Sequence, residues 1–359
     1  MIITGDIAAP GLKHSIQLSV IFNEFRSIFQ GKSLLCNLEG LLGEQISVTR
    51  KPVLSNHPSV ISVLKNRGSV IAALANNHIL DLPEYFDTSV ELLKQTGIFY
   101  TGAGKTQKDA ELPVNIIEDK KHFFILNACW DFLLYNHDNP TKGIHVAEIN
   151  EASLLDRVLS LRKGNPNAVI IVYLHWSFDL ETLPFPMHRI FSRALIDNGA
   201  NIVAGNHSHC VQGGEKYNNG FIVYGLGNFF IPYKTFAGSY LTFPDFARLQ
   251  LAFEFNVETN TGTCHWFEYQ NEGECHTMKH LASERFEESV ILKRFSPYSG
   301  MSDSEYYHYF RKNRRKKFLI PIFKDYRNRR LNKILTLWLK IRARFARMLA
   351  TYKIIGWQR

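Results

Sequence analysis

The stretch NIVAGNHSH, residues 201–209, places two histidines directly after a short apolar run. An earlier stretch, AVIIVYLHWS at residues 168–177, has the same arrangement, because a continuous apolar run ends at His175. Apolar runs of this length without polar alternation are typical of strands that are buried on both faces. Longer segments with helical spacing of apolar residues separate such runs. The chain is therefore predicted to fold as a layered α/β protein with buried strands.

The same alternation extends from the start of the sequence to about residue 230. Seven runs are predicted to be strands: residues 1–4, 33–38, 69–75, 122–128, 168–174, 201–204 and 220–224. Four helices are predicted between them: residues 58–67, 86–96, 151–163 and 188–198. Residues 248–269 contain two alternating segments around the turn ETNTG, which predicts a hairpin added to a sheet. The polar segment 270–310 is predicted to be mostly loop with a short helix.

The composition is that of a globular protein, with 45% hydrophobic and 21% charged residues in 359 positions. The five cysteines are odd in number and form no CxxC pair, which argues against a disulfide framework. The first residues lack the basic and apolar segments of a signal peptide, and no run has the ~18 apolar residues of a membrane-spanning helix. These features predict a cytoplasmic protein.

The positive charge is concentrated in the last part of the sequence. Residues 311–359 hold 17 Lys/Arg and one acidic residue, whereas residues 1–310 hold 25 Lys/Arg and 32 Asp/Glu. An acidic body thus carries a basic tail of net charge +16, which predicts a surface for an anionic partner. Apolar residues recur in this tail every three or four positions, as in a basic amphipathic helix. They are Leu331, Ile334, Leu335, Trp338, Ile341, Phe345, Met348, Leu349 and Tyr352.

Polar side chains stand where five of the predicted strands end. They are Asp6 after the first run, Asn37 and Glu39 at the end of the second, Asn76, Asn77 and His78 after the third, and His175, His207 and His209 after two later runs. Ligands of α/β proteins bind at the carboxyl ends of the strands. Carboxylate, amide and imidazole ligands without a thiolate suit Mn²⁺, Fe or Zn²⁺ in a catalytic site. A carboxylate that bridges two such ions would support in-line displacement at phosphorus.

Seven short segments are informative as a set, because their order and spacing match those of a known family. They are GD (5–6), NLEG (37–40), ANNHILD (75–81), GAG (102–104), HWS (175–177), LIDNGANIVAGNHSHCVQG (195–213) and YGLGNFF (224–230). Together they resemble the capsule-synthesis CapA family of poly-γ-glutamate capsule biosynthesis, within the calcineurin-like metallophosphoesterase superfamily. The resemblance implies a metallophosphoesterase-like four-layer sandwich, in which two mixed β-sheets are flanked by helices. It places this domain in residues 1–280, followed by a polar connector (281–310) and the basic helical tail (311–359).

The resemblance also implies roles for individual residues. One or two divalent metal ions (Mn, Fe or Zn) would be held by Asp6, Glu39, Asn77, His175, His207 and His209. His78 would contact the phosphoryl group and protonate the leaving oxygen, with Asp81 orienting it. Two positions depart from the superfamily pattern, because Ala8 stands where the first motif has a histidine and Asn206 replaces another histidine. The first metal site is then one ligand short, which leaves one tight ion or a second, weaker one as alternatives.

Two functions follow from the resemblance. The first is hydrolysis, in which a metal-activated hydroxide attacks a phosphoester or similar anionic substrate during capsule or surface-polysaccharide biosynthesis. The alternative is a non-catalytic factor that handles a polymer at the membrane. The tail is predicted to bind an anionic membrane surface, with an anionic polymer, a partner protein or nucleic acid as alternatives. These predictions describe a peripheral protein at the inner membrane face that works with capsule-assembly proteins.

Each candidate residue also has a purely structural explanation. The alternatives are a turn cap for Asp6, an ion pair with Lys51 for Glu39, a helix cap for Asn77 and His78, a core position for His175, and an exposed turn for His207 and His209. The Cys-His pairs at 264–265 and 275–276 fit no zinc template, and a hairpin explains them better. Asn228 either lines the site or follows a tight turn.

Overall fold

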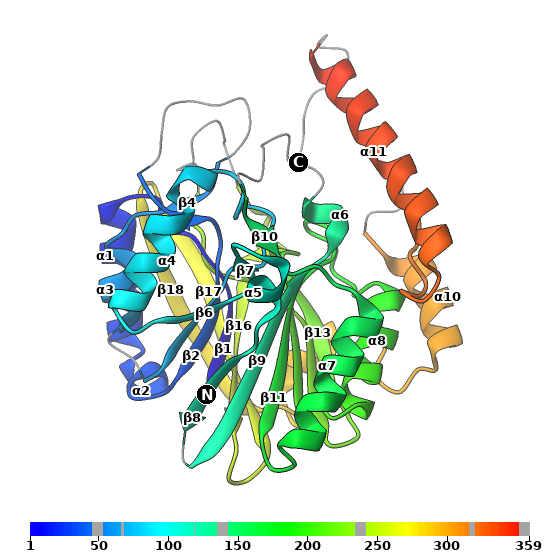
Figure 1. The fold of residues 1–359 in the computed structure, drawn as a ribbon, viewed down its shortest axis with the longest axis horizontal. Coiled ribbons are helices and arrows are strands. Elements are labelled where there is room, and N and C mark those ends of the chain that lie inside the picture. Colours follow the sequence, from blue (N-terminus) through cyan, green and yellow to red (C-terminus); the bar gives the residue numbers. More distant parts are fainter. Residues whose placement is uncertain are drawn as a thin grey trace.

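Two mixed β-sheets, one of eight strands and one of six, form the centre of the protein. The computed structural model describes residues 1–44, 53–65, 68–118, 120–134, 143–233, 242–315 and 320–351. The sheets pack face to face through a shared apolar core, and helices lie on both outer sides (Figure 1). The predicted four-layer α/β sandwich is therefore confirmed.

The eight-stranded sheet is built around β1 (Ile2–Ile7), in the order β18-β17-β16-β1-β2-β5-β6, with β15 also paired to β1. Its other strands are β2 (Leu34–Leu38), β5 (Val70–Ala73), β6 (Phe99–Thr101), β15 (Asn228–Phe230), β16 (Leu249–Asn256), β17 (Thr261–Glu272) and β18 (Cys275–Arg285). Strands β2, β5, β6 and β15 extend a parallel half from β1. Strands β16, β17 and β18 form an antiparallel half.

The six-stranded sheet has the order β13-β14-β12-β11-β9-β8. Its strands are β8 (Val114–Glu118), β9 (Lys121–Cys129), β11 (Val169–His175), β12 (Ile202–Asn206), β13 (Val211–Tyr217) and β14 (Gly220–Leu226). The four inner strands β14, β12, β11 and β9 run parallel, so their carboxyl ends share one edge. Two short ladders accompany the main sheets: β3 (Leu41–Leu42) with β4 (Ser55–Asn56), and β7 (Ala103–Gly104) with β10 (His145–Val146).

Helices cover the outer sides of the sandwich (Figure 1). On the side of the eight-stranded sheet lie α1 (Leu12–Glu24), α2 (Arg26–Phe29), α3 (Val60–Lys65) and α4 (Phe86–Gln95), and on the other side α7 (Glu151–Gly164), α8 (Pro186–Asp197) and α10 (Asp303–Asn313). The remaining helices are α5 (Gln107–Glu111), α6 (Asp131–Leu134), α9 (Val290–Phe295), α11 (Arg329–Thr351) and the short 3₁₀ turns η1 (Pro83–Tyr85) and η2 (Asp245–Ala247).

The buried strands explain why the sequence lacks polar alternation. Ile3 and Ile71 point into the core between the sheets, where they join Ile171 of the six-stranded sheet. Their neighbours Ile2 and Val70 point the other way, into the core beneath the helices. Because both faces of these strands are covered, consecutive positions are apolar.

All seven predicted strands and all four predicted helices are present at their positions, and the predicted hairpin is β16–β17. The end of the predicted helix 58–67 lies outside the described residues. The prediction for residues 270–310 is wrong, because this segment holds β18, α9 and α10. Strand β18 is an edge strand with only His276 and Met278 fully buried in its first half, so its composition is polar. The division of the chain at residues 280 and 310 stays a prediction.

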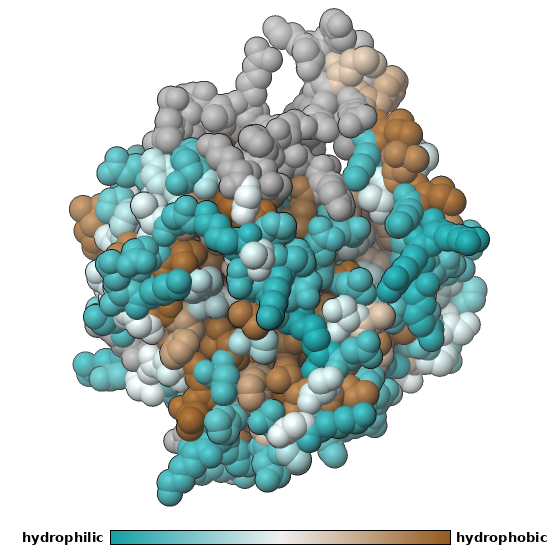
Figure 2. Space-filling model, in the orientation of Figure 1, coloured by the Kyte–Doolittle hydropathy of each residue, from teal (hydrophilic) through white to brown (hydrophobic). Residues whose placement is uncertain are grey.

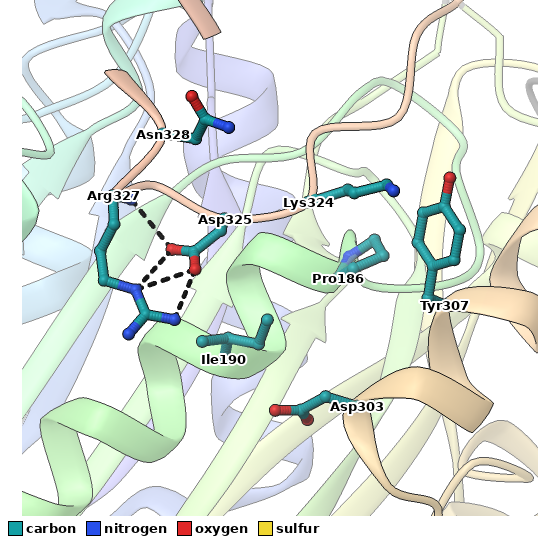
Figure 3. A pocket seen from close by; sticks show the side chains of 8 residues that line it. All are labelled: Pro186, Ile190, Asp303, Tyr307, Lys324, Asp325, Arg327 and Asn328. Atoms are coloured by element: carbon teal, nitrogen blue, oxygen red, sulfur yellow. Dashed lines mark hydrogen bonds and ion pairs between the residues drawn. The ribbon is translucent and has the colours of Figure 1, made fainter. Parts of the chain in front are cut away.

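The basic tail is anchored to the body before it becomes helical. Phe323 is 1% exposed and its ring centroid lies 5.1 Å from that of Trp130. The segment that precedes α11 borders a surface pocket of about 590 Å³, which α8 and α10 also line (Figure 3). In this pocket the Arg327 Nε donates to Asp325 Oδ2 at 2.8 Å. The lining carries charges of both signs, from Lys324, Arg327, Asp303 and Asp325.

Helix α11 follows and spans 23 residues, which confirms the predicted helical tail; Tyr352 lies outside the described residues. Leu339 is buried and Leu335 packs against the body. Figure 2 shows apolar surface along the part of α11 that projects from the body. The exposed apolar side chains of this helix are Leu331, Ile334, Leu337, Trp338, Ile341, Phe345 and Met348. Among the described residues, no helix is both long and apolar enough to span a membrane.

Candidate metal centre

The strand ends that carry the predicted site residues lie level with one another. Asp6 near the end of β1 pairs in register with Asn37 of β2 and with Asn228 of β15. In the other sheet, His175 at the end of β11 pairs with Asn206 at the end of β12. The two sheet edges therefore present their polar residues at the same end of the sandwich.

Buried hydrogen bonds fix how the two sheets meet beneath these edges. The Tyr173 hydroxyl of β11 donates to the carbonyl of Thr4 in β1 at 2.6 Å. Asn127 of β9 donates to the Tyr173 carbonyl at 2.9 Å and accepts the Ala75 N–H at 2.7 Å. Gly102 has φ of 100°, and a Cβ there would lie 2.0 Å from Asn127 Oδ1, so only glycine fits. These contacts hold the oxygen-bearing and imidazole-bearing edges in one arrangement.

The six predicted ligand residues converge into two clusters that share Glu39. One cluster contains Asp6, Glu39 and His209, and the other contains Glu39, His175 and His207. In each cluster one potential ligand atom per residue lies within 4.8 Å of the others. Asn77 joins the second cluster, because its Oδ1 lies 2.6 Å from His175 Nε2. The structure thus brings all six side chains together.

Several polar atoms of this centre have no hydrogen-bond partner among the described residues. They are both carboxylate oxygens of Glu39, Asp6 Oδ2, His175 Nδ1 and His207 Nδ1. All are buried, and an unsatisfied buried polar atom costs roughly 1–3 kcal/mol. Divalent cations would satisfy the Glu39 and Asp6 oxygens and the His207 nitrogen, since they accept lone pairs from carboxylate oxygen and imidazole nitrogen. The nitrogen of His175 that lies beside Asn77 is instead Nε2. The residues present therefore fit a divalent metal ion.

The electrostatics of the metal-free side chains favour metal binding at His175 and His207, whereas Glu39 and His209 would have to lose a proton first. Burial, together with the charge of Asp6, raises the pKa of Glu39 well above its usual range. Burial lowers the pKa of His175 and lowers that of His207 to about 4. For His209 burial acts in the same direction, but the Asp6 and Glu39 carboxylates outweigh it and raise the pKa to about 10. His175 and His207 are therefore neutral at pH 7, as metal ligands must be.

An asparagine frame holds the carboxylate side of the centre. Asn37 Nδ2 donates to Asp6 Oδ1 at 2.8 Å, and Asn76 Nδ2 donates to Asn37 Oδ1 at 3.1 Å. Asn228 Oδ1 lies 2.7 Å from His209 Nδ1. Asn228 therefore lines the site, which resolves the two alternatives for this residue.

The predicted catalytic pair lies at the same centre. His78 Nδ1 is 2.6 Å from Asp81 Oδ2, which also accepts the Leu54 N–H at 3.0 Å. His78 Nε2 is 3.8 Å from Glu39 Oε1. Because Asp81 holds Nδ1, the Nε2 atom is the nitrogen turned toward the clusters. Ala8 is buried and adds no ligand atom.

Of the structural alternatives, the ion pair of Glu39 with Lys51 lies outside the described residues. The Cys-His pairs form no cluster of three potential metal ligands among the described residues. Instead, His265 bonds to Ser283 at 2.8 Å and to Glu254 at 2.9 Å, and His276 bonds to Tyr269 at 2.8 Å. Strand packing therefore accounts for these two histidines.

One site residue escaped the sequence analysis. Asp179 Oδ1 lies 3.2 Å from His207 Nε2, and Asp179 forms a third cluster of potential ligands with His207 and His209. It follows His175 by four residues in a turn rather than at a strand end, so the strand-end criterion could not select it. The only sequence signal was its nearness to the HWS segment.

Comparison with known proteins connects this geometry to a family. Residues 1–233 match the family described as bacterial capsule synthesis protein PGA_cap. The chain belongs to this family. The match confirms the predicted resemblance to a capsule-synthesis family. The matched residues include every member of the two clusters that share Glu39.

Two curated capsule-synthesis proteins are similar in sequence to this chain. The chain is 27% identical to the capsule biosynthesis protein CapA of Bacillus anthracis over 187 residues, which cover 49% of this chain and 43% of that protein. It is 28% identical to the PGA biosynthesis protein CapA of Bacillus subtilis (strain 168) over 185 residues, with 49% and 46% coverage. The chain spans about half the length of the curated relatives it matches.

A solved structure with a related arrangement is that of a putative 5'-nucleotidase from Staphylococcus aureus. It aligns with 83% of this chain and 57% of its own chain, at 8% identity and a TM-score of 0.42. A similarity at this level carries no argument about function.

Proposed function

We propose that this PGA_cap protein is a metal-dependent hydrolase that acts on a phosphoester or similar anionic substrate in capsule polymer biosynthesis. The observation that carries the proposal is the buried Glu39 carboxylate, which belongs to both ligand clusters and has no hydrogen-bond partner among the described residues. A carboxylate shared between two ion positions is the arrangement used by two-metal phosphoesterases. The substrate would belong to the synthesis of a surface polymer of the poly-γ-glutamate type, which the family resemblance implies.

The proposed ion sites combine the two sheets. Asp6, Glu39 and His209 would hold one divalent ion, and Glu39, Asn77, His175 and His207 a second, with Mn, Fe or Zn as the candidates. A bound ion would supply Lewis acidity and a nucleophilic water at neutral pH. The buried walls of the site exclude bulk water from these side chains.

His78 would supply the proton for the leaving group. Asp81 accepts the N–H at Nδ1, so Nε2 faces the centre beside Glu39. In the protonated state His78 would bind a phosphoryl oxygen through Nε2 and pass that proton to the leaving oxygen. Such a general acid contributes typically ~10²–10⁴-fold to the rate.

The first experiment measures metal content by mass spectrometry, together with hydrolysis of an aryl phosphate monoester and diester in the presence of Mn²⁺. The wild type is compared with His207→Ala and His78→Ala. We expect His207→Ala to lose metal and activity, and His78→Ala to keep the metal but lose activity. A wild type that binds metal but hydrolyses neither ester, or a His78→Ala variant with full activity, would contradict the proposed mechanism.

One observation favours a second candidate function. The Asp6 cluster has three ligand residues, and Ala8 contributes none where the superfamily pattern has a histidine. A protein that binds a single ion without turnover would act as a polymer-handling factor instead. This candidate predicts one bound ion per chain, no hydrolysis of either ester, and specific binding of a polyanion such as poly-γ-glutamate.

We further propose that α11 binds an anionic membrane surface, at the inner face and beside capsule-assembly proteins. Ile334 and Ile341 are 64% and 57% exposed on a helix face that lies opposite the buried Leu339. Exposed basic residues, including Arg330 and Lys333, accompany this face. A helix with an apolar face and basic flanks binds at the interface of anionic lipids, where each nearby charge contributes ~1 kcal/mol.

Sedimentation with phosphatidylserine-containing vesicles tests the membrane proposal. Point variants are preferable to removal of residues 311–359, because Phe323 is part of the core. The double variant Ile334→Ser/Ile341→Ser should bind vesicles at least about tenfold more weakly. Ile117→Ser is the matched control, since Ile117 on edge strand β8 is 65% exposed. Equal vesicle binding by all three proteins would contradict the proposal.

A further inference from the structure

The turn after β11 is joined to the turn that carries His207. Ser177 and Leu180 in the first turn have φ values of 80° and 60°, and His207 in the second has φ of 78°. The Leu180 N–H donates to the Ser208 carbonyl at 2.8 Å. Non-glycine residues in this left-handed region cost roughly 1–3 kcal/mol each, so the surrounding contacts must hold both turns in place.

A side chain contributes to the same joint. Gln212 Nε2 donates to the Ser177 hydroxyl at 3.0 Å and to the Glu181 carbonyl at 2.7 Å, and all three residues are buried. Asp179 is the middle one of the three residues between these two contact points. Its backbone is therefore fixed relative to the histidine turn, although its side chain is 44% exposed.

The two nitrogens of the His207 ring have different surroundings. Nε2 faces Asp179 Oδ1 at 3.2 Å. Nδ1 is buried without a hydrogen-bond partner among the described residues. The ring centroid lies 4.7 Å from that of His175, which shares a ligand cluster with His207 and Glu39.

We infer that Asp179 is a positioning residue that orients His207 for metal binding; the inference rests on the proposed function. The Asp179 carboxylate accepts the N–H of His207 Nε2. That nitrogen then carries the ring proton, and Nδ1 presents its lone pair toward Glu39 and His175. A carboxylate behind a ligating histidine fixes the tautomer and the ring orientation and raises the basicity of the ligand.

The test uses the full chain in two forms. In the metal-free protein, long-range ¹H–¹⁵N spectra report which His207 nitrogen carries the proton. Titration calorimetry with Mn²⁺ reports metal affinity. Asp179→Ala removes the acceptor, whereas Asp179→Asn keeps an oxygen that accepts the N–H. Asp87→Ala is the control, because Asp87 is an exposed aspartate that pairs with Lys105 on the surface.

In the wild type we expect the proton on Nε2, and in Asp179→Ala a mixture of tautomers. Asp179→Ala should bind Mn²⁺ about 10–100-fold more weakly, with a smaller loss in Asp179→Asn and none in Asp87→Ala. An unchanged tautomer and unchanged Mn²⁺ affinity in Asp179→Ala would overturn the inference. A wild type that binds no Mn²⁺ would instead refute the proposed function, and the tautomer spectra would still decide whether Asp179 orients the ring.

Discussion

The two sheets bring different chemistry to one site. The eight-stranded sheet and its loops supply oxygen ligands, from Asp6, Glu39 and Asn77, and the six-stranded sheet supplies nitrogen ligands, from His175, His207 and His209. Each of the two clusters that share Glu39 takes residues from both sheets. Neither sheet alone can form the site, so the site depends on how the two sheets pack. The buried hydrogen bonds from Tyr173 to Thr4 and from Ala75 to Asn127 hold that packing in place.

Removal of the shared carboxylate should have the largest effect on this arrangement. Glu39→Gln keeps the shape of the side chain but removes its charge from both clusters. We expect loss of tight Mn²⁺ binding and a fall in ester hydrolysis of about 1,000-fold, because metal catalysis contributes several kcal/mol. Calorimetry and the aryl phosphate assay measure both effects. Glu258→Gln, in an exposed turn, is the control. Wild-type turnover in Glu39→Gln would show that the sheets do not share a metal through this residue.

The strands and most of the candidate ligands could be predicted from sequence, because the ends of apolar strands are easy to recognise. Continuous apolar runs identified the strands, and residues such as Asp6 and His207 stood at their ends. The side chains that orient them were not predictable in the same way. Asp179 lies in an exposed turn, and Asn37 was indistinguishable from a ligand until its hydrogen bond to Asp6 was seen. Strand β18 was missed because an edge strand needs few apolar residues.

Acid should lower the free energy of unfolding of the metal-free protein, because His207 is held neutral in the folded state. The folded state keeps His207 neutral down to its pKa of about 4, whereas the unfolded chain takes up a proton below 6.5. The unfolded state then binds more protons, so the free energy of unfolding falls as the pH drops from 6.5 through 4. For His207 this loss is on the order of 3 kcal/mol. His209 has the opposite sign, since its raised pKa of about 10 contributes stability that is lost only as the pH rises through that value.

Urea denaturation of the metal-free protein near neutral pH and near pH 4 measures this loss. His207→Gln is the informative variant, because it lacks the titrating ring. Its acid-induced loss should be smaller than that of the wild type by roughly the contribution of His207. An equal loss in both proteins would place the acid sensitivity elsewhere.

The hydrogen bond between Tyr173 and Thr4 should contribute less to the free energy of unfolding than the titration of His207 does. Tyr173→Phe removes the hydroxyl that donates to Thr4 across the sheet interface. A buried carbonyl then loses its donor, and the free energy of unfolding should fall by about 2 kcal/mol. Tyr217→Phe is the control, because that hydroxyl bonds to Asp197 at the surface and should contribute little. Equal stability of the two variants would mean that the Tyr173 hydroxyl does not hold the sheets together.

The smallest expected effect is on Mn²⁺ affinity when Asn228, which contacts the candidate ligand His209, is replaced. Asn228→Ala removes the oxygen that contacts His209 Nδ1. Mn²⁺ affinity should fall about tenfold, the lower end of the range for a partner behind a metal ligand. Calorimetry would compare it with Asn219→Ala, which changes an exposed asparagine. A loss as large as that of Glu39→Gln would identify Asn228 as a ligand rather than a supporting residue.

The central place of β1 has a consequence for protein synthesis. This first strand pairs with residues that emerge much later, through Asp6 with Asn228 and Ile2 with Glu254. A ribosome adds roughly 5–20 residues per second, so a nascent β1 waits on the order of ten to fifty seconds for these partners. During that time one edge of an apolar strand is open to chaperones and to other chains. Metal capture would wait as well, because the last imidazole leaves the ribosome only after some two hundred residues have been made.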